Sequence, residues 1–171
     1  LIVFAKGVTS GYVPLGGVVI PTKIAETFND RVFPGGLTYS GHPLACATAI
    51  ATIDVMKEEK MVENAAMIGE KIIAPGLAEL AKKHQVIGDV RGQGVFWGID
   101  LVVDRATREP LAPYGASSPK MNEIVATCKK NGLMPFNNFN RIHLNPPCNV
   151  SESDAKLGLE IFSKSLSELG L

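Results

Sequence analysis

The chain has 171 residues, 46% of them hydrophobic and 20% charged, a composition that can fill a folded core and argues against disorder. Its 17 basic and 17 acidic residues balance and are interspersed, so no field of one sign exists to attract nucleic acid or an anionic membrane. No apolar run approaches the roughly 20 residues that span a bilayer, and the expected partner is a small molecule or another protein.

The three cysteines, Cys46, Cys128 and Cys148, are far apart and form no CxxC pair. This spacing argues against a disulfide framework and against a zinc site, so no metal is expected, and it favours a reducing, cytoplasmic setting. The chain opens directly on a buried-strand pattern with neither an initiator Met nor a leader. We therefore expect it to be a fragment of a longer protein.

The first half of the chain has an α/β pattern. Residues 2–5 and 17–20 are short, rich in β-branched side chains and bounded by Gly or Pro, which predicts strands covered on both faces in a parallel-type layer. Pro21 opens a short helix to about Phe28, and Pro43 opens a stronger helix to about Glu58. Helical spacing continues over 60–84, where Pro75-Gly76 is expected to kink or divide the helix.

The second half predicts a smaller α+β domain. Residues 86–104 contain two strand-like stretches, and residues 104–119 form an irregular connection. Ser118 is the expected N-cap of a helix that ends before Gly132, residues 133–136 and 141–144 are paired strands, and Ser151 begins a last helix. The fold class is therefore α/β, with a first domain over residues 1–85 and a small α+β domain over residues 86–171.

Lys6 is the strongest candidate for a residue that takes part in chemistry. It stands at the end of the first predicted strand and enters a loop of small residues. Burying a charged lysine costs several kcal/mol, and an uncharged amine in such a place can form a Schiff base with a carbonyl group. On position alone, an ordinary strand-end lysine whose ammonium reaches water is the more frequent case.

The sequence around Lys6 favours the Schiff-base interpretation. The segment Ala5–Gly17, AKGVTSGYVPLGG, strongly resembles the lysine segment of the class III aminotransferases, which are fold type I pyridoxal-phosphate enzymes. The resemblance implies that Lys6 holds pyridoxal 5'-phosphate as a Schiff base and shuttles the proton at the substrate carbon. It also implies that the chain is the C-terminal part of the cofactor-binding large domain, followed by the small domain.

Three further segments carry the same resemblance. Residues 38–47, TYSGHPLACA, are similar to the family segment whose threonine binds the cofactor phosphate of the neighbouring subunit, which implies this role for Thr38 and a homodimer. Residues 90–100, VRGQGVFWGID, resemble the segment that opens the small domain. There we expect Arg91 to be structural, bonding carboxylates or carbonyls, rather than to contact substrate.

The third segment, residues 141–150, bears on substrate binding. Its sequence RIHLNPPCNV is similar to a family strand that often carries an arginine before Pro-Pro. In the family, this arginine binds the substrate carboxylate. The corresponding position is occupied by His143, while Arg141 lies two residues earlier and so on the same face of the strand. Both are candidate substrate-binding residues, and the sequence leaves open which of them faces the substrate.

The resemblance implies ping-pong transamination between an amine or ω-amino acid, such as taurine, and a keto acid such as pyruvate. In the family, the acidic residue that holds the pyridine nitrogen precedes the lysine, so we expect this chain alone to be inactive. One alternative is an aminomutase or decarboxylase of the same family, which shares the lysine segment. Another is a non-catalytic α/β domain that binds no ligand.

Overall fold

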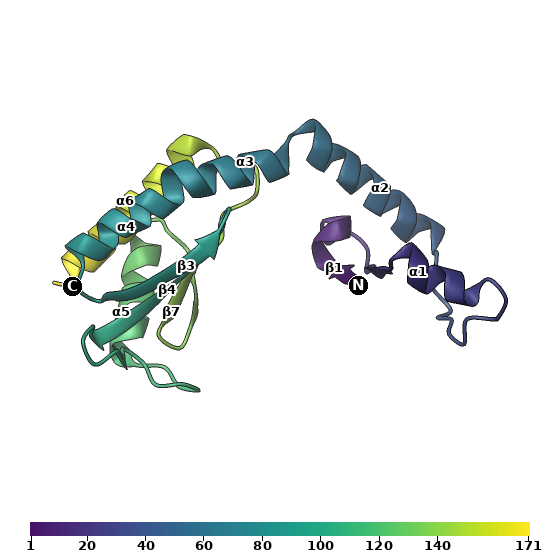
Figure 1. The fold of residues 1–171 in the computed structure, drawn as a ribbon. Helices are drawn as coiled ribbons and strands as arrows, with labels where there is room; N and C mark the ends of the chain where they lie inside the picture. The colour runs from purple at the N-terminus through teal and green to yellow at the C-terminus, as the bar shows by residue number, and fades with distance from the viewer. The chain divides into compact units, whose positions relative to one another are not determined.

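The computed structural model describes all of residues 1–171. The chain forms two compact units, a first unit of residues 1–59 and a second unit of residues 60–171 (Figure 1). None of the helices combines the length and hydrophobicity that crossing a membrane requires. The two units are described separately below.

The first unit begins with a strand pair. Strand β1 (Ile2–Ala5) pairs with β2 (Gly16–Val19) in antiparallel register, with Ile2 opposite Val19. The predicted parallel arrangement is wrong for this pair, because parallel strands need a crossover of a dozen or more residues and residues 6–15 are too few. The strand side chains are largely exposed rather than covered on both faces.

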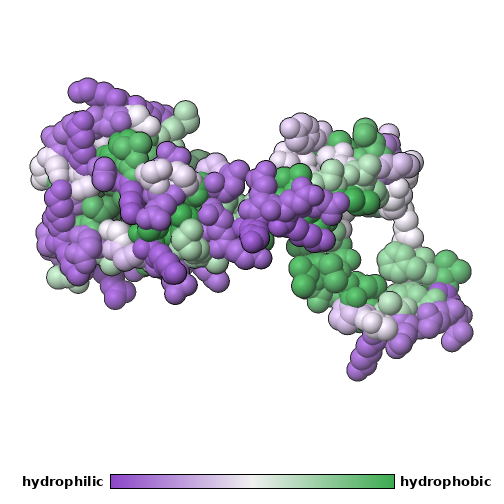
Figure 2. All heavy atoms as spheres, turned by 90° about the horizontal axis from the view of Figure 1, so that it is seen from above, coloured by the Kyte–Doolittle hydropathy of each residue, from purple (hydrophilic) through white to green (hydrophobic).

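Helices make up the rest of the first unit. A short helix α1 (Thr22–Ala25) runs into the 3-10 turn η2 (Glu26–Phe28), and α2 spans Pro43–Glu58. Both helices begin at the predicted prolines: Pro21 is the N-cap of α1, and Pro43 is the first residue of α2, where its missing N–H would have no helical partner. On the face that Figure 2 shows, hydrophobic side chains gather over this unit, whereas hydrophilic ones dominate the second unit.

The second unit opens with one long helical stretch (Figure 1). It consists of α3 (Met61–Ile68), a five-residue π-helical turn η3 (Gly69–Ile73) and α4 (Ala74–Lys83). The predicted division at Pro75-Gly76 does not occur, and the irregularity lies in the turn before Pro75. A proline ring clashes with the carbonyl four residues earlier, here that of Lys71, and a widened π turn relieves that clash.

An antiparallel sheet faces these helices. Its strand order is β3 (Ile87–Gln93), β4 (Phe96–Asp104), β7 (Arg141–Leu144) and β6 (Phe136–Asn138), with β5 (Glu109–Pro110) paired to β4. The helices α5 (Pro119–Lys130) and α6 (Glu152–Glu168) complete the unit. The Ser118 hydroxyl accepts from Met121 N at 3.2 Å and the Ser151 hydroxyl from Asp154 N at 3.0 Å, so both predicted N-caps are confirmed.

The core lies between one face of the sheet and the helices. Alternate strand residues supply it, and the fully buried large side chains include Ile99, Ile142, Leu77, Ile124, Phe162 and Leu166. The intervening strand residues point to the opposite face, which we call the open face. Because side chains alternate along a strand, this open face carries residues 89 and 91 of β3, 96, 98 and 100 of β4, 141 and 143 of β7, and 136 and 138 of β6.

The two compact units and the two predicted domains are different divisions of the chain. Packing of α3, η3 and α4 against the sheet and α6 places residues 60–85 in the second unit. The assignment of residues 1–85 to a cofactor-binding domain and of residues 86–171 to a small domain stays a prediction.

Candidate functional site

Lys6 lies at the first residue of a tight turn. The strand β1 ends at Ala5, and the 3-10 turn η1 spans Lys6–Thr9 with Lys6 itself in the left-handed region at a φ of 55°. The Thr9 side chain is 1% exposed, and its hydroxyl donates to the carbonyl of Val13 at 2.5 Å. This bond closes the loop that follows the lysine and fixes the direction in which the chain leaves β1.

The Lys6 amine is available for chemistry. It is exposed and forms no hydrogen bond or ion pair within the chain. It lines a hollow of about 490 Å³ together with Ala5, Thr9, Gly11, Val13, Pro14, Leu15 and Gly16. A primary amine beside a hollow of small and apolar residues fits a carbonyl-bearing aromatic cofactor, because the amine can bond the carbonyl carbon and the walls do not crowd the ring.

Thr38 lies in a turn just before α2. The backbone N–H of His42 donates to Tyr39 O at 3.1 Å, and the N–H of Leu37 donates to Ser40 Oγ at 3.3 Å. Thr38 is exposed, and its hydroxyl has no partner in the chain. A free hydroxyl ahead of the N-terminus of a 16-residue helix suits a phosphate group. Thr38 does not line the hollow at Lys6.

His42 has a feature that the sequence did not predict. Its Nδ1 atom is buried and lacks a hydrogen-bond partner, and its ring lies 5.7 Å from that of Tyr39. Both rings line a separate hollow of about 410 Å³ with Val13, Pro14, Leu15 and Ala45. The sequence signal was the Gly-His-Pro step before the helix, but the lack of a partner for Nδ1 depends on the folding of residues 13–15 beside it.

An ionic network crosses the open face of the second unit. The Nε of Arg141 donates to Asp100 at 2.7 Å, and an Nη of Arg91 donates to the other oxygen of Asp100 at 2.5 Å. Arg91 also bonds Asp89. Burial alone raises the pKa of Asp100, but the hydrogen bonds from Arg141 and Arg91 outweigh it and hold this pKa below its ordinary value. Arg91 thus bonds carboxylates, as predicted for a structural role.

His143 lies beside this network in aromatic surroundings. Its ring is 5.3 Å from that of Phe136 and 6.4 Å from that of Phe96, and its Nε2 is buried without a partner. Burial, and then the positive charge of Arg141, lower the pKa of His143, so the ring is neutral at neutral pH. His143 and Arg141 share the open face, as their spacing predicted.

His143 also borders a cavity that Arg141 does not reach. This cavity of about 650 Å³ lies between the loop after β7 and the start of α6, with Asn145, Pro146 and Asp154 among its walls. Of the two candidate substrate-binding residues, only His143 lines it. The structure therefore places one candidate at a cavity and the other in an ion network.

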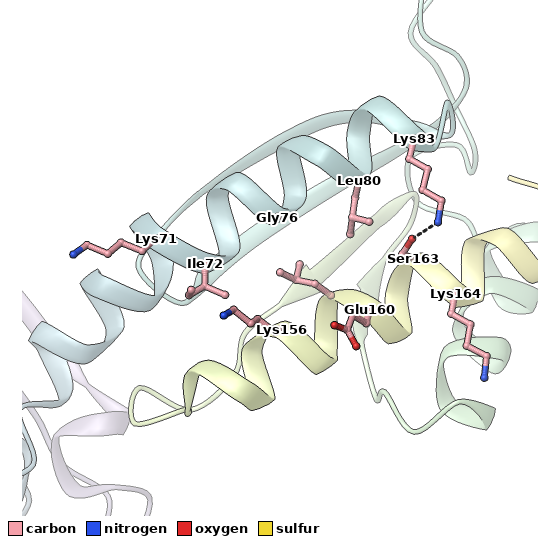
Figure 3. Close-up of a pocket in the computed structure, with 10 residues that line it drawn as sticks. Lys71, Ile72, Gly76, Leu80, Lys83, Lys156, Glu160, Ser163 and Lys164 are labelled. Carbon is pink, nitrogen blue, oxygen red and sulfur yellow. Dashed lines mark hydrogen bonds between the residues drawn. The ribbon is translucent and has the colours of Figure 1, made fainter.

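A groove between α4 and α6 contains none of the predicted site residues (Figure 3). Its volume is about 560 Å³, with an apolar floor that includes Gly76 and Leu159. Three of its four lysines have partners: Lys156 pairs with Glu152 at 2.5 Å, Lys164 pairs with Glu168 at 3.7 Å, and Lys83 donates to Ser163 at 3.0 Å. Exposed ion pairs such as that between Lys156 and Glu152 contribute little to stability.

Known proteins are similar to this chain in sequence and in fold over 90% or more of its length. The family model described as "Aminotransferase class-III" matches residues 1–166. The 5-aminovalerate aminotransferase DavT of Pseudomonas aeruginosa is 36% identical, with 99% of this chain and 38% of that protein covered. Ethanolamine-phosphate phospho-lyase homolog 1 of Caenorhabditis elegans is 42% identical, with 90% of this chain and 32% of that protein covered.

A solved structure agrees with these sequence matches. The taurine:2-oxoglutarate aminotransferase of Bifidobacterium kashiwanohense, in complex with PLP and glutamate, superposes with a TM-score of 0.87 at 35% identity. The alignment covers 98% of this chain and 37% of that one. The chain thus spans less than two fifths of the length of these relatives.

Proposed function

Because the chain belongs to the class-III aminotransferase family, we propose that it contributes the lysine-bearing part of a pyridoxal-phosphate-dependent aminotransferase. The reaction moves an amino group from an amine or ω-amino acid to a keto acid such as pyruvate, in two halves with ping-pong kinetics. The relatives are named for 5-aminovalerate, taurine and ethanolamine phosphate, and each of these compounds joins an amine to an acidic group. We assign the same substrate class to this protein.

The observation that carries the proposal is the free amine of Lys6, a residue that lines the hollow. Pyridoxal phosphate, when bound, supplies the electron sink that makes a proton on the substrate carbon removable. Lys6 would hold the cofactor through its Nζ and, once displaced by an amino substrate, would accept and return that proton through the same atom. The bond from Thr9 to Val13 keeps the lysine at a fixed place on the strand end.

The other predicted residues take binding roles. Thr38 would donate its free hydroxyl to the cofactor phosphate of a neighbouring subunit, so the proposal includes a homodimer. Arg141 would bind the acidic group of the substrate, since a guanidinium can clamp a carboxylate with parallel N–H donors. His143 is neutral and would form a wall beside it rather than a charge partner.

The proposal extends to the setting of the enzyme. The 171 residues cover under two fifths of the relatives' length, so we expect this chain by itself to lack transaminase activity. Three dispersed cysteines, one of them buried, support a reducing, cytoplasmic location. The predicted division into a cofactor-binding domain to residue 85 and a small domain after it belongs to the same proposal.

The test is covalent capture of the cofactor. The full-length protein is mixed with pyridoxal phosphate, reduced with borohydride and digested, and the expected result is a pyridoxyl group on the peptide that contains Lys6. Lys6→Ala should abolish this adduct, whereas Lys23→Ala, which removes another exposed lysine of the same unit, should leave it intact. An unmodified Lys6 in the wild-type protein would refute the proposal and favour a non-catalytic domain.

A lyase is the second candidate, because the relative with 42% identity is named as a phospho-lyase. The lysine segment does not separate the two reactions. Product analysis separates them: an aminotransferase forms alanine only when pyruvate is present, whereas a lyase, an aminomutase or a decarboxylase consumes its amine without a keto acid.

A further inference from the structure

Arg141 is anchored through only one of its three guanidinium nitrogens. Its Nε donates to Asp100 Oδ1 at 2.7 Å, and its two terminal nitrogens have no partner in the chain. The side chain is about two fifths exposed, so these nitrogens are accessible on the open face. A guanidinium held at Nε still presents its terminal pair of nitrogens, whose parallel N–H bonds match the two oxygens of a carboxylate.

Gly98 gives Arg141 the space to lie in this position. Gly98 lies on β4, opposite His143 of the neighbouring strand β7 that also carries Arg141. A Cβ added to Gly98 would lie 3.1 Å from Arg141 Cδ. Such a contact is tighter than nine in ten real Cβ contacts. The aliphatic part of Arg141 therefore lies over a glycine, and a larger residue would push it aside.

Asp100 is in turn held from its other side. Its Oδ2 accepts from Arg91 at 2.5 Å, so each carboxylate oxygen bonds a different guanidinium. The Asp100 side chain is 18% exposed, compared with 52% for Asp89, which bonds Arg91 alone. Rotation of Asp100 would break both bonds, and this doubly held carboxylate is a rigid anchor for Arg141.

We infer that Asp100 and Gly98 are positioning residues that preset the terminal nitrogens of Arg141 to bind the carboxylate of an amino or keto acid substrate. The inference rests on the proposed function and gives a role to two residues of the segment 90–100 that the family resemblance left without one. The competing explanation is that the ions only tie β3, β4 and β7 together. In that case Asp100 affects the stability of the sheet and has no effect on the choice of substrate.

The experiment compares two amino donors in the full-length enzyme. They are 5-aminovalerate and pentylamine, which carries a methyl group in place of the carboxylate. Asp100→Asn and Gly98→Ala should lower kcat/KM for 5-aminovalerate about tenfold, mainly through KM, as expected when one charged contact is misplaced. The kcat/KM for pentylamine should change less than about twofold, and Asp100→Glu should restore part of the loss.

Asp89→Asn is the matched control. It removes an ion pair from the same network and the same face but leaves the bond between Asp100 and Arg141 in place. Asp89→Asn should leave kcat/KM unchanged for both 5-aminovalerate and pentylamine. Equal losses on both donors, or the same selective loss in Asp89→Asn, would overturn the inference and leave the network a structural device.

A binding measurement on the 171-residue chain keeps this test separate from the test of the proposed function. Arginine side-chain NMR signals are followed while acetate is added. Acetate should shift the signals of Arg141 in the wild-type chain. In Asp100→Asn, the same shift should require an acetate concentration about tenfold higher. The absence of any shift at Arg141 in the wild-type chain would overturn the inference, even if Lys6 captures the cofactor in the full-length protein.

Discussion

The π turn packs closely against the β3–β4 hairpin where Gly69 lies beside Gly94, and this contact yields a sharp prediction. A Cβ added at Gly69 would lie 2.1 Å from the carbonyl oxygen of Gly94 and 2.5 Å from its carbonyl carbon and Cα. Ordinary van der Waals contacts of a Cβ begin at 3.4 Å. In Gly69→Ala, the helix and the hairpin would therefore have to move apart by more than about 1 Å.

Gly76, seven residues further along the same helical stretch, is the matched comparison. A Cβ there would lie 2.4 Å from Leu159, but the atom it meets is the tip of a flexible side chain rather than backbone. In both variants alanine gains about 1 kcal/mol of helix propensity over glycine. Overpacking costs about 1–3 kcal/mol, and we expect the upper end where backbone meets backbone.

The expected result is a loss of about 2 kcal/mol or more in the free energy of unfolding for Gly69→Ala and a change within about 1 kcal/mol for Gly76→Ala. The measurement is urea unfolding of the 171-residue chain, followed by far-UV circular dichroism and by fluorescence. The single tryptophan is a suitable probe, because the indole N–H of Trp97 donates to Gly94 O at 2.7 Å. Displacement of that carbonyl should also shift the emission of the folded protein.

The reasoning would be refuted if Gly69→Ala were as stable as Gly76→Ala. It would fail equally if the alanine stabilised the protein by the full difference in helix propensity. Either result would mean that the hairpin yields to the helix at little cost, so that Gly69 is not needed for the close approach.

Three more predictions follow from the same unit and from the cysteines. Because the pKa of Asp100 is lowered in the folded state, its contribution to stability is present above the ordinary pKa of about 4 and is lost as the pH falls through the folded value. The difference in unfolding free energy between wild type and Asp100→Asn, from urea titrations at several pH values, should therefore shrink in acid. Ser151→Ala should cost about 1 kcal/mol in the same assay, since it leaves an N–H of the first turn of α6 without its cap. In a thiol titration with a disulfide reagent, exposed Cys148 should react first and Cys128 only after unfolding, because it is buried and burial raises the pKa of its thiol.

Features set by nearby residues were predictable from the sequence. The helix start at Pro43 and the cap at Ser118 each depend on chemistry within a few residues, and both occur where the sequence predicted them. The shared face of Arg141 and His143 also followed from the two-residue period of a strand. These parts of the fold needed no knowledge of distant contacts.

Features set by distant residues were not predictable in the same way. The bond between Asp100 and Arg141 joins residues 41 apart in sequence and depends on the register of β4 against β7, which no local pattern fixes. The π turn before Pro75 was missed because proline predicts a disturbance without specifying its form. The exposed position of Lys6, expected to lie in a buried setting, depends on which parts of a protein surround the strand end.

The left-handed backbone conformation of Lys6 lowers the stability of the fold at a residue for which we propose a chemical role. A side chain with a Cβ pays about 1 kcal/mol or more to hold a φ of 55°, whereas glycine holds it freely. Conformation alone therefore favours glycine at this position, but glycine has no side-chain amine and could not form the proposed bond to the cofactor. A lysine held there at a conformational cost is consistent with the role that we propose for its amine, because strained backbone is found most often at functional sites.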